Sequence, residues 1–121
     1  MTSEEIVALY YDAWQNRGGD LSEVPLAEDF TFTGPVASFE DAAGYRAMAS
    51  EAGQAVTSFE VRRQFLDGDT VCSIIDWEMA IPGTGRMTSA ELLEVKDGKI
   101  VRGELIYDAE ELRRAMAQQQ R

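Results

Sequence analysis

The spacing of apolar residues predicts helices in the first half of the chain and strands in the second. The segment from Thr2 to Arg17 repeats apolar residues every three or four positions, as one face of a helix does. The segment Asp20–Ala27 predicts a short second helix that Pro25 makes irregular. Asp41–Ala52 predicts a third helix, and the alternation in Asp29–Thr33 indicates a short strand between the two.

Four longer segments alternate as strands, and turn residues separate them. They are Val56–Leu66, Thr70–Ile81, Gly85–Val95 and Lys99–Tyr107. Asp-Gly, Pro-Gly-Thr and Lys-Asp-Gly connect them, and Asp108 is placed to cap a final helix. We therefore expect one α+β domain over residues 1–121. Its curved antiparallel sheet, covered by three N-terminal helices and a C-terminal helix, would enclose a pocket for a small organic molecule.

The turns also predict which side chains share the covered face of this sheet. A two-residue turn at Asp67-Gly68 pairs Phe59 with Asp76, and a turn centred at Pro82-Gly83 pairs Ile74 with Glu91. The covered face then carries Phe59, Val61, Arg63, Cys72, Ile74, Asp76, Glu78, Met87, Ser89, Glu91, Gly103, Leu105 and Tyr107. The opposite face includes Ile75, Trp77, Leu92 and Ile106, and would suit a homodimer interface.

Two carboxyls on this covered face suggest chemistry. Asp76 and Glu91 become diagonal neighbours, with backbone positions roughly 7–8 Å apart. Burial and mutual repulsion would raise the pKa of at least one carboxyl toward neutrality, as a general acid or base requires. The competing interpretation is that this face meets solvent and that both carboxyls are ordinary surface charges.

Composition narrows the classes of function. The net charge of -11 argues against a nucleic-acid partner and against anionic membrane surfaces. No apolar run approaches the ~20 residues of a membrane span, and the acidic start lacks signal-peptide character, so we expect a cytoplasmic protein. The chain has no histidine, which excludes serine–histidine and cysteine–histidine mechanisms and disfavours zinc. The single Cys72 rules out an internal disulfide, and we expect neither metal nor cofactor.

The order of elements resembles the NTF2-like superfamily, which includes SnoaL-like polyketide cyclases, ketosteroid isomerase and limonene epoxide hydrolase. The Asp-Gly-Lys-Ile sequence at Asp97–Ile100, running into Tyr107-Asp108 and a last helix, carries this resemblance over nearly the whole chain. It implies a cone-shaped fold that hosts enzymes, binding modules and scaffolds alike.

Individual residues resemble those of two enzymes in this group. Tyr10, Tyr45 and Glu91 match the oxyanion-hole tyrosine, its supporting tyrosine and the protonated strand aspartate of ketosteroid isomerase, but Gly34 stands where its catalytic base would be. Asp76 matches one aspartate of limonene epoxide hydrolase. That enzyme's arginine and second aspartate are replaced by Ile74 and Leu105.

The leading hypothesis is a cofactor-independent enzyme acting on a small, mostly apolar substrate by isomerisation, aldol-type cyclisation or epoxide opening. Asp76 would exchange a proton, while protonated Glu91 and Tyr10 would donate hydrogen bonds to a developing oxyanion. The predicted pocket walls are Trp14, Phe32, Tyr45, Phe59, Ile74, Glu78, Met87, Leu105 and Tyr107. The alternative is a non-catalytic small-molecule-binding or dimeric assembly module, in which the tyrosines are core residues.

Overall fold

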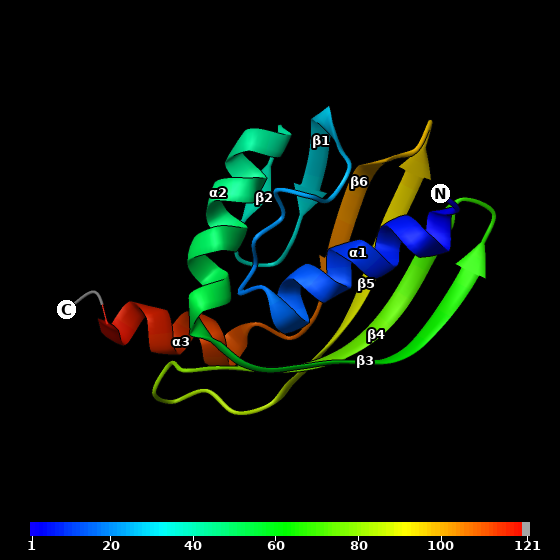
Figure 1. Ribbon diagram of the computed structural model, residues 1–121. Coiled ribbons are helices and arrows are strands. Elements are labelled where there is room, and N and C mark those ends of the chain that lie inside the picture. The colour runs from blue at the N-terminus through cyan, green and yellow to red at the C-terminus, as the bar shows by residue number, and fades with distance from the viewer. Residues whose placement is uncertain (120–121) are drawn as a thin grey trace.

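The computed structural model describes residues 1–119 as helices packed on one curved sheet (Figure 1). Its elements are α1 (Ser3–Asn16), β1 (Leu26–Thr33), β2 (Ser38–Phe39), α2 (Ala42–Ala52), a 3₁₀ turn (Gly53–Ala55), β3 (Val56–Asp67), β4 (Thr70–Met79), β5 (Met87–Lys96), β6 (Lys99–Ile106) and α3 (Glu110–Gln119). The strand order is β2-β1-β6-β5-β4-β3, and only the described pair β1–β6 runs parallel. The expected α+β class with a curved, helix-covered sheet is confirmed.

The first helix begins where the sequence places its cap. The Thr2 hydroxyl accepts a hydrogen bond from the Glu5 backbone N–H at 3.1 Å, and the Glu5 carboxylate accepts one from the Thr2 N–H at 2.9 Å. This reciprocal pair satisfies two backbone donors that a helix start would otherwise leave free. The helix crosses the concave face of the sheet and buries Tyr10 and Tyr11 against it (Figure 1).

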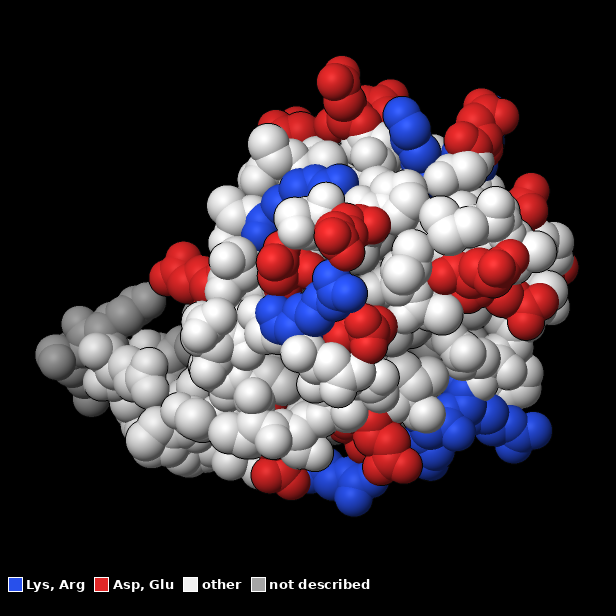
Figure 2. Space-filling view, in the orientation of Figure 1, with Lys and Arg blue, Asp and Glu red and all other residues white. Residues whose placement is uncertain are grey.

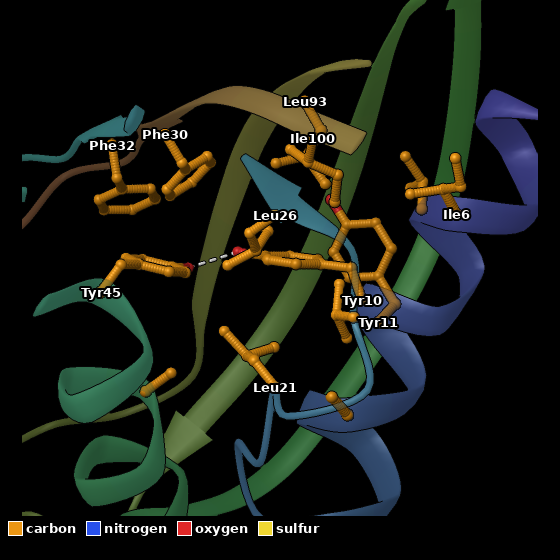
Figure 3. Packing of buried hydrophobic residues seen from close by; sticks show 14 of the residues in the cluster. Ile6, Tyr10, Tyr11, Leu21, Leu26, Phe30, Phe32, Tyr45, Leu93 and Ile100 are labelled. Carbon is orange, nitrogen blue, oxygen red and sulfur yellow. Dashed lines mark hydrogen bonds between the residues drawn. The ribbon is translucent and has the colours of Figure 1, made fainter. Parts of the chain in front are cut away.

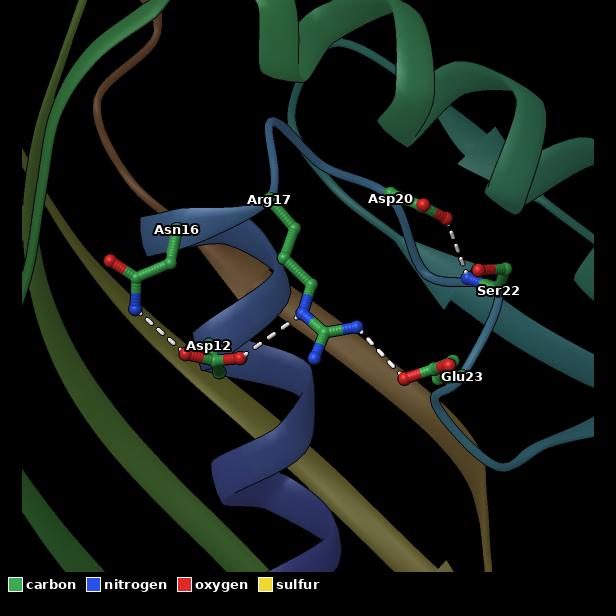
Figure 4. A network of polar contacts seen from close by, with 6 residues as sticks. All are labelled: Asp12, Asn16, Arg17, Asp20, Ser22 and Glu23. Carbon is green, nitrogen blue, oxygen red and sulfur yellow. Dashed lines mark hydrogen bonds and ion pairs between the residues drawn. The ribbon is translucent and has the colours of Figure 1, made fainter.

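The predicted helix at Asp20–Ala27 is wrong. The Asp20 carboxylate accepts a hydrogen bond from the Ser22 N–H at 2.9 Å, which holds a turn, and Arg17 joins Asp12 to Glu23 (Figure 4). The Arg46 guanidinium binds the backbone carbonyls of this segment, and Leu26 already pairs with β6. Carbonyls that bind Arg46, together with a proline, favour a turn that runs into β1 over a short helix.

Two glycines let the ends of α1 and α2 touch through their backbones. A Cβ at Gly19 would lie 2.1 Å from the Ala49 carbonyl oxygen, and a Cβ at Gly53 would lie 2.0 Å from the Gly18 carbonyl oxygen. Gly19 also has a φ of +80°, which larger residues rarely adopt. This contact fixes the two helices relative to each other, and so brings Tyr10 of α1 to Tyr45 of α2.

The predicted register of β4 is off by one residue against both neighbours. Phe59 of β3 pairs with Trp77, and Glu91 of β5 pairs with Ser73. A one-residue shift turns every side chain of a strand to the other face. Ser73, Ile75 and Trp77 therefore lie on the covered face, and Asp76 points away from it.

Local irregularities explain this shift. The β3–β4 hairpin closes with Asp67 opposite Thr70, and its register shifts again between Val61 and Arg63. The β4–β5 connection runs from Ala80 to Arg86, too long for a two-residue turn to set the pairing. Bulges and long loops each add residues that alternation alone does not locate.

The β5–β6 hairpin has the predicted facing. Glu91 pairs with Leu105, and a register shift after a two-residue turn replaces the expected three-residue loop. Gly103 lies on the covered face opposite Leu93, and a Cβ there would stand 3.1 Å from the Phe32 ring and 3.3 Å from Leu93. Its missing side chain leaves room for the aromatic rings of β1.

The last helix is tied down at three places. The Asp108 carboxylate accepts a hydrogen bond from the Glu110 N–H at 3.1 Å. The Glu111 carboxylate accepts one from the Gly85 N–H in the β4–β5 connection, and Arg113 donates to the Pro35 carbonyl. α3 therefore lies across one end of the sheet (Figure 1). None of the helices within residues 1–119 has the length and apolar character needed to cross a membrane.

Candidate functional site

A cavity of about 660 Å³ lies between the concave face of the sheet and the helices. This volume is within the ~300–1,000 Å³ range of small-molecule sites. Its described lining is Tyr10, Trp14, Phe32, Gly34, Pro35, Val36, Ala37, Tyr45, Met48, Glu51, Ala52, Ala55, Val56, Phe59, Ile75, Trp77, Met79, Ala80, Ile81, Glu91, Leu105, Tyr107, Leu112, Met116 and Gln119. Most of these side chains are apolar, so the cavity favours a ligand with an apolar body.

Glu91 is the buried carboxyl of this cavity, with 4% of its surface exposed. Its Oε2 accepts a hydrogen bond from the Tyr10 hydroxyl at 3.0 Å, and its Oε1 accepts one from the Tyr11 hydroxyl at 2.9 Å. The Tyr45 hydroxyl lies 2.5 Å from that of Tyr10. Figure 3 shows Tyr10 and Tyr45 reaching toward each other from α1 and α2. Tyr10 has one hydroxyl proton, which it donates to Glu91, so Tyr45 donates to Tyr10.

Burial controls the titration of this cluster. It raises the pKa of Glu91 to about 7, although the hydrogen bonds from Tyr11 and Tyr10 act in the opposite direction. Burial, together with the nearby Glu91 charge, raises the pKa of Tyr10, Tyr11 and Tyr45 well above the ordinary tyrosine value. Near neutral pH the tyrosines keep their protons while Glu91 exchanges one.

A model of the SnoaL-like domain family matches residues 7–103, most of the chain. The chain belongs to the SnoaL-like family. No protein with a curated description matches it.

Solved structures place this SnoaL-like protein in the NTF2-like fold. An NTF2-like protein of unknown function from Cytophaga hutchinsonii is 22% identical with a TM-score of 0.80, covering 93% of this chain and 95% of that one. A Catenulispora acidiphila protein with a ketosteroid isomerase-like fold, in complex with trimethylamine, is 16% identical with a TM-score of 0.74 over 92% and 90%. An M. tuberculosis epoxide hydrolase, described as LEH-like, is 16% identical with a TM-score of 0.72 over 96% and 90%.

Many of the predicted site residues of this SnoaL-like protein meet at the cavity. They are Tyr10, Trp14, Phe32, Tyr45, Phe59, Glu91, Leu105 and Tyr107. They come from α1, from α2 and from four strands or strand ends. Residues far apart in the sequence are therefore brought together by the fold. Their placement agrees with the predicted pocket walls, while their roles stay predictions.

The predicted placement of Asp76 beside Glu91 is wrong. Asp76 lies on the outer face of the sheet, where it contacts Arg62 at 2.9 Å, Arg86 at 2.8 Å and the Thr88 hydroxyl at 2.6 Å. The Thr88 hydrogen bond, followed by the Arg86 and Arg62 contacts, lowers the pKa of Asp76 to about 2. A carboxyl held ionised on the far face cannot exchange protons with a molecule in the cavity.

Three other predicted wall residues also lie elsewhere. Ile74 and Glu78 share the outer face with Asp76, because the three residues alternate along β4 and the one-residue register shift moves them all to that face. Met87 is buried opposite Trp77 on the covered face but does not reach the cavity. The epoxide hydrolase arrangement suggested by Asp76 is therefore not assembled around this cavity.

The predictions missed three kinds of site residue. Ile75, Trp77 and Met79 line the cavity because β4 is turned over. Tyr11 supplies the second hydrogen bond to Glu91, and two adjacent tyrosines in an amphipathic helix are the signal that points to it. Leu112 and Met116 of α3 complete the wall through a long-range contact that no local pattern reveals. Among residues 1–119, no cluster of three or more Cys, Asp or Glu side chains is arranged to hold a metal ion.

Proposed function

We propose that this SnoaL-like protein is a cofactor-independent enzyme that moves a proton on a small, mostly apolar molecule. One observation carries the proposal: Glu91, whose pKa is raised to about 7 by burial, borders an apolar cavity. A carboxyl with a pKa near the working pH is present both as base and as acid, which suits general acid–base catalysis.

The tyrosines leave Glu91 able to react. An ionised carboxylate has about four lone-pair positions, and Tyr10 and Tyr11 occupy one on each oxygen. A remaining lone pair can take a proton from a bound carbon acid. Once Glu91 is protonated, the hydroxyl hydrogen of Tyr45 is free to turn toward the oxygen that gains negative charge. Isomerisation and aldol-type cyclisation are the reactions this arrangement favours.

A chromogenic carbon acid tests this role. The base removes the ring C–H proton of 5-nitrobenzisoxazole, the N–O bond breaks and a coloured cyano-nitrophenolate is released, so no other reactant is needed. We expect turnover to rise with pH through about 7, because Glu91 must be ionised to accept the proton. Replacing Glu91→Gln should lower the rate by about 100-fold or more.

The matched control is Glu78→Gln, the same substitution at an exposed position on the outer face of β4. Its rate and pH profile should equal those of the wild type. Turnover that survives Glu91→Gln, or a flat pH profile across neutrality, would reject Glu91 as the base.

A second candidate is a binding protein without chemistry. Two observations favour it: the only other carboxyl of the described lining is the exposed Glu51, and Gly34 occupies the position of the ketosteroid isomerase base. Such a protein would bind probes in the cavity without turning over the carbon acid, so the same assay separates the two candidates.

We also infer a homodimer through the outer face of the sheet. Apolar side chains there include Ile74, Leu92 and the 53%-exposed Ile106. Arg102 and Glu104 lie on the same face, so two copies related by a two-fold axis can place opposite charges together. Leu92 and Ile106 of the predicted dimer surface lie on this face, whereas Ile75 and Trp77 of that surface line the cavity instead.

A further inference from the structure

The cavity has an aromatic wall that spans several elements. The rings of Trp14 and Phe59 stack with centroids 6.1 Å apart, and those of Trp77 and Tyr107 meet edge to face at 5.2 Å. Phe59 and Trp77 are directly opposed on neighbouring strands, which joins the two pairs into one surface. Phe32, Tyr45 and Tyr10 also line the cavity. Aromatic faces carry partial negative charge and attract cations.

The charged groups of the cavity have one sign. Within residues 1–119, the lining includes the carboxyls of Glu91 and of the exposed Glu51 but neither lysine nor arginine. The chain as a whole carries a net charge of -11, and acidic side chains are spread over the face shown in Figure 2. An anionic ligand would meet no compensating charge here, and a neutral one would leave ionised Glu91 desolvated without a counterion.

We propose that the ligand of this cavity is an organic ammonium cation with an apolar body, held against the aromatic wall and paired with Glu91. This inference deepens the proposed function, since it names the substrate class for the same cavity. The apolar body of such a ligand would pack against the aliphatic lining, and its cationic head would lie against the aromatic faces. The Glu91 carboxylate would supply the negative counter-charge.

Ligand charge can be varied at constant shape. Phenyltrimethylammonium and tert-butylbenzene differ by one nitrogen in place of one carbon, and benzoate serves as an anionic probe. Both tryptophans of the chain line the cavity, so their fluorescence reports binding. At about pH 8 we expect phenyltrimethylammonium to bind about tenfold tighter than tert-butylbenzene, with no detectable binding of benzoate.

This preference should fall as the pH drops below about 7. The groups that face Glu91 are Tyr10 and Tyr11 of α1 and Tyr45 of α2, and all three keep their protons in this range. The quaternary probe does not titrate. A change in the affinity ratio with pH therefore reports the charge of Glu91.

Two variants separate the carboxylate from the aromatic wall. Glu91→Gln should abolish the pH dependence of the affinity ratio. Trp77→Leu should reduce the ratio severalfold while changing the affinity for tert-butylbenzene much less, and Trp14 remains as the reporter. Glu78→Gln, on the outer face, should leave the ratio unchanged.

Equal affinities, tighter binding of tert-butylbenzene or benzoate, or no binding of any probe would each overturn the ammonium ligand. The carbon-acid assay is independent of this result. Turnover that depends on Glu91 without ammonium preference would retain the acid–base enzyme and reject only its substrate class. Ammonium preference without turnover would retain the ligand and reject the enzyme.

Discussion

Two effects act on the charged form of Glu91 in opposite directions. Its burial destabilises the charged form, and the hydroxyls of Tyr10 and Tyr11 partly compensate by hydrogen bonding to it. A buried apolar residue of similar size would avoid this cost, since it needs no hydrogen-bond partners. The carboxyl is therefore better explained by an action on a ligand than by a contribution to folding.

The cost of ionising Glu91 predicts the pH dependence of stability. Its folded-state pKa of about 7 lies above the unfolded value of 4.5, so the native state binds the proton more tightly. The stabilising contribution is complete below pH 4.5 and is lost as the pH rises through 7. The loss amounts to about 3 kcal/mol of the free energy of unfolding.

Urea unfolding of the wild type and Glu91→Gln at about pH 5 and pH 8 measures this loss. Relative to the wild type, the variant should gain stability on going to the higher pH. Asp76→Asn is the contrasting case, because the lowered pKa of Asp76 stabilises the protein above pH 3.8 and the effect is lost as the pH falls through about 2. A constant difference between wild type and Glu91→Gln at all pH values would contradict a raised pKa.

At this scale, prediction of a site residue succeeded or failed with the predicted facing of the element that carries it. The resemblance to ketosteroid isomerase placed Tyr10, Tyr45 and Glu91 together, and the structure brings them within hydrogen-bond distance. The geometric argument for Asp76 failed because it relied on a strand register. The match of Asp76 to an aspartate of limonene epoxide hydrolase failed for the same reason, whereas Tyr10, Tyr45 and Glu91 lie on elements whose facing was predicted correctly.

At the scale of elements, a one-residue shift in the register of β4 decides which of its side chains face the cavity. Its inward side chains are Val71, Ser73, Ile75 and Trp77, and its outward ones include Asp76 and Glu78. The alternation of the strand itself was consistent with this facing, since it sends both acidic residues outward. The turn at Pro82-Gly83 favoured the opposite facing, but in a long connection the turn position does not determine the pairing.

The anchoring of α3 gives an element-scale prediction. The Glu111 carboxylate ties this helix to the Gly85 N–H, while its neighbour Glu110 pairs with Arg114 on the same helix. Glu111→Ala should loosen the wall formed by Leu112 and Met116 and cost about 1 kcal/mol of stability. Acrylamide should then quench tryptophan fluorescence more strongly than in the wild type.

Glu110→Ala is the control for this experiment, because it removes a carboxylate from the same turn without touching the β4–β5 connection. An exposed ion pair of this kind contributes little to stability. Equal quenching in both variants would mean that the Gly85 contact does not hold α3 in place.

At the scale of the whole molecule, the proposed interface on the outer sheet face predicts that the protein is a dimer in solution. Sedimentation velocity at micromolar concentration should give about twice the 13.4 kDa chain mass. Ile106→Arg places a charge within the proposed interface and should yield the monomer with an unchanged circular dichroism spectrum. A wild-type monomer at this concentration would rule out the homodimer.

The overall architecture was predictable because it rests on many residues. Helix periods, hairpin turns and the order of elements agree on one fold, so errors at single positions do not alter it. The false helix at Asp20–Ala27 left the class intact, since that segment forms a turn bound by Arg46 and then enters β1, which pairs with β6. The site was less predictable because it depends on which face of one strand meets the cavity.

The row of hydroxyls from Tyr45 through Tyr10 to Glu91 has a direction. With Glu91 charged, every O–H along it points toward the carboxylate, and Tyr45 can offer a ligand only a lone pair. Once Glu91 is protonated and donates to Tyr10, the row reverses and Tyr45 turns its hydrogen outward. A single proton on Glu91 then changes what the cavity presents at Tyr45: an acceptor for donor groups above neutrality, and a donor for carbonyl oxygens below it.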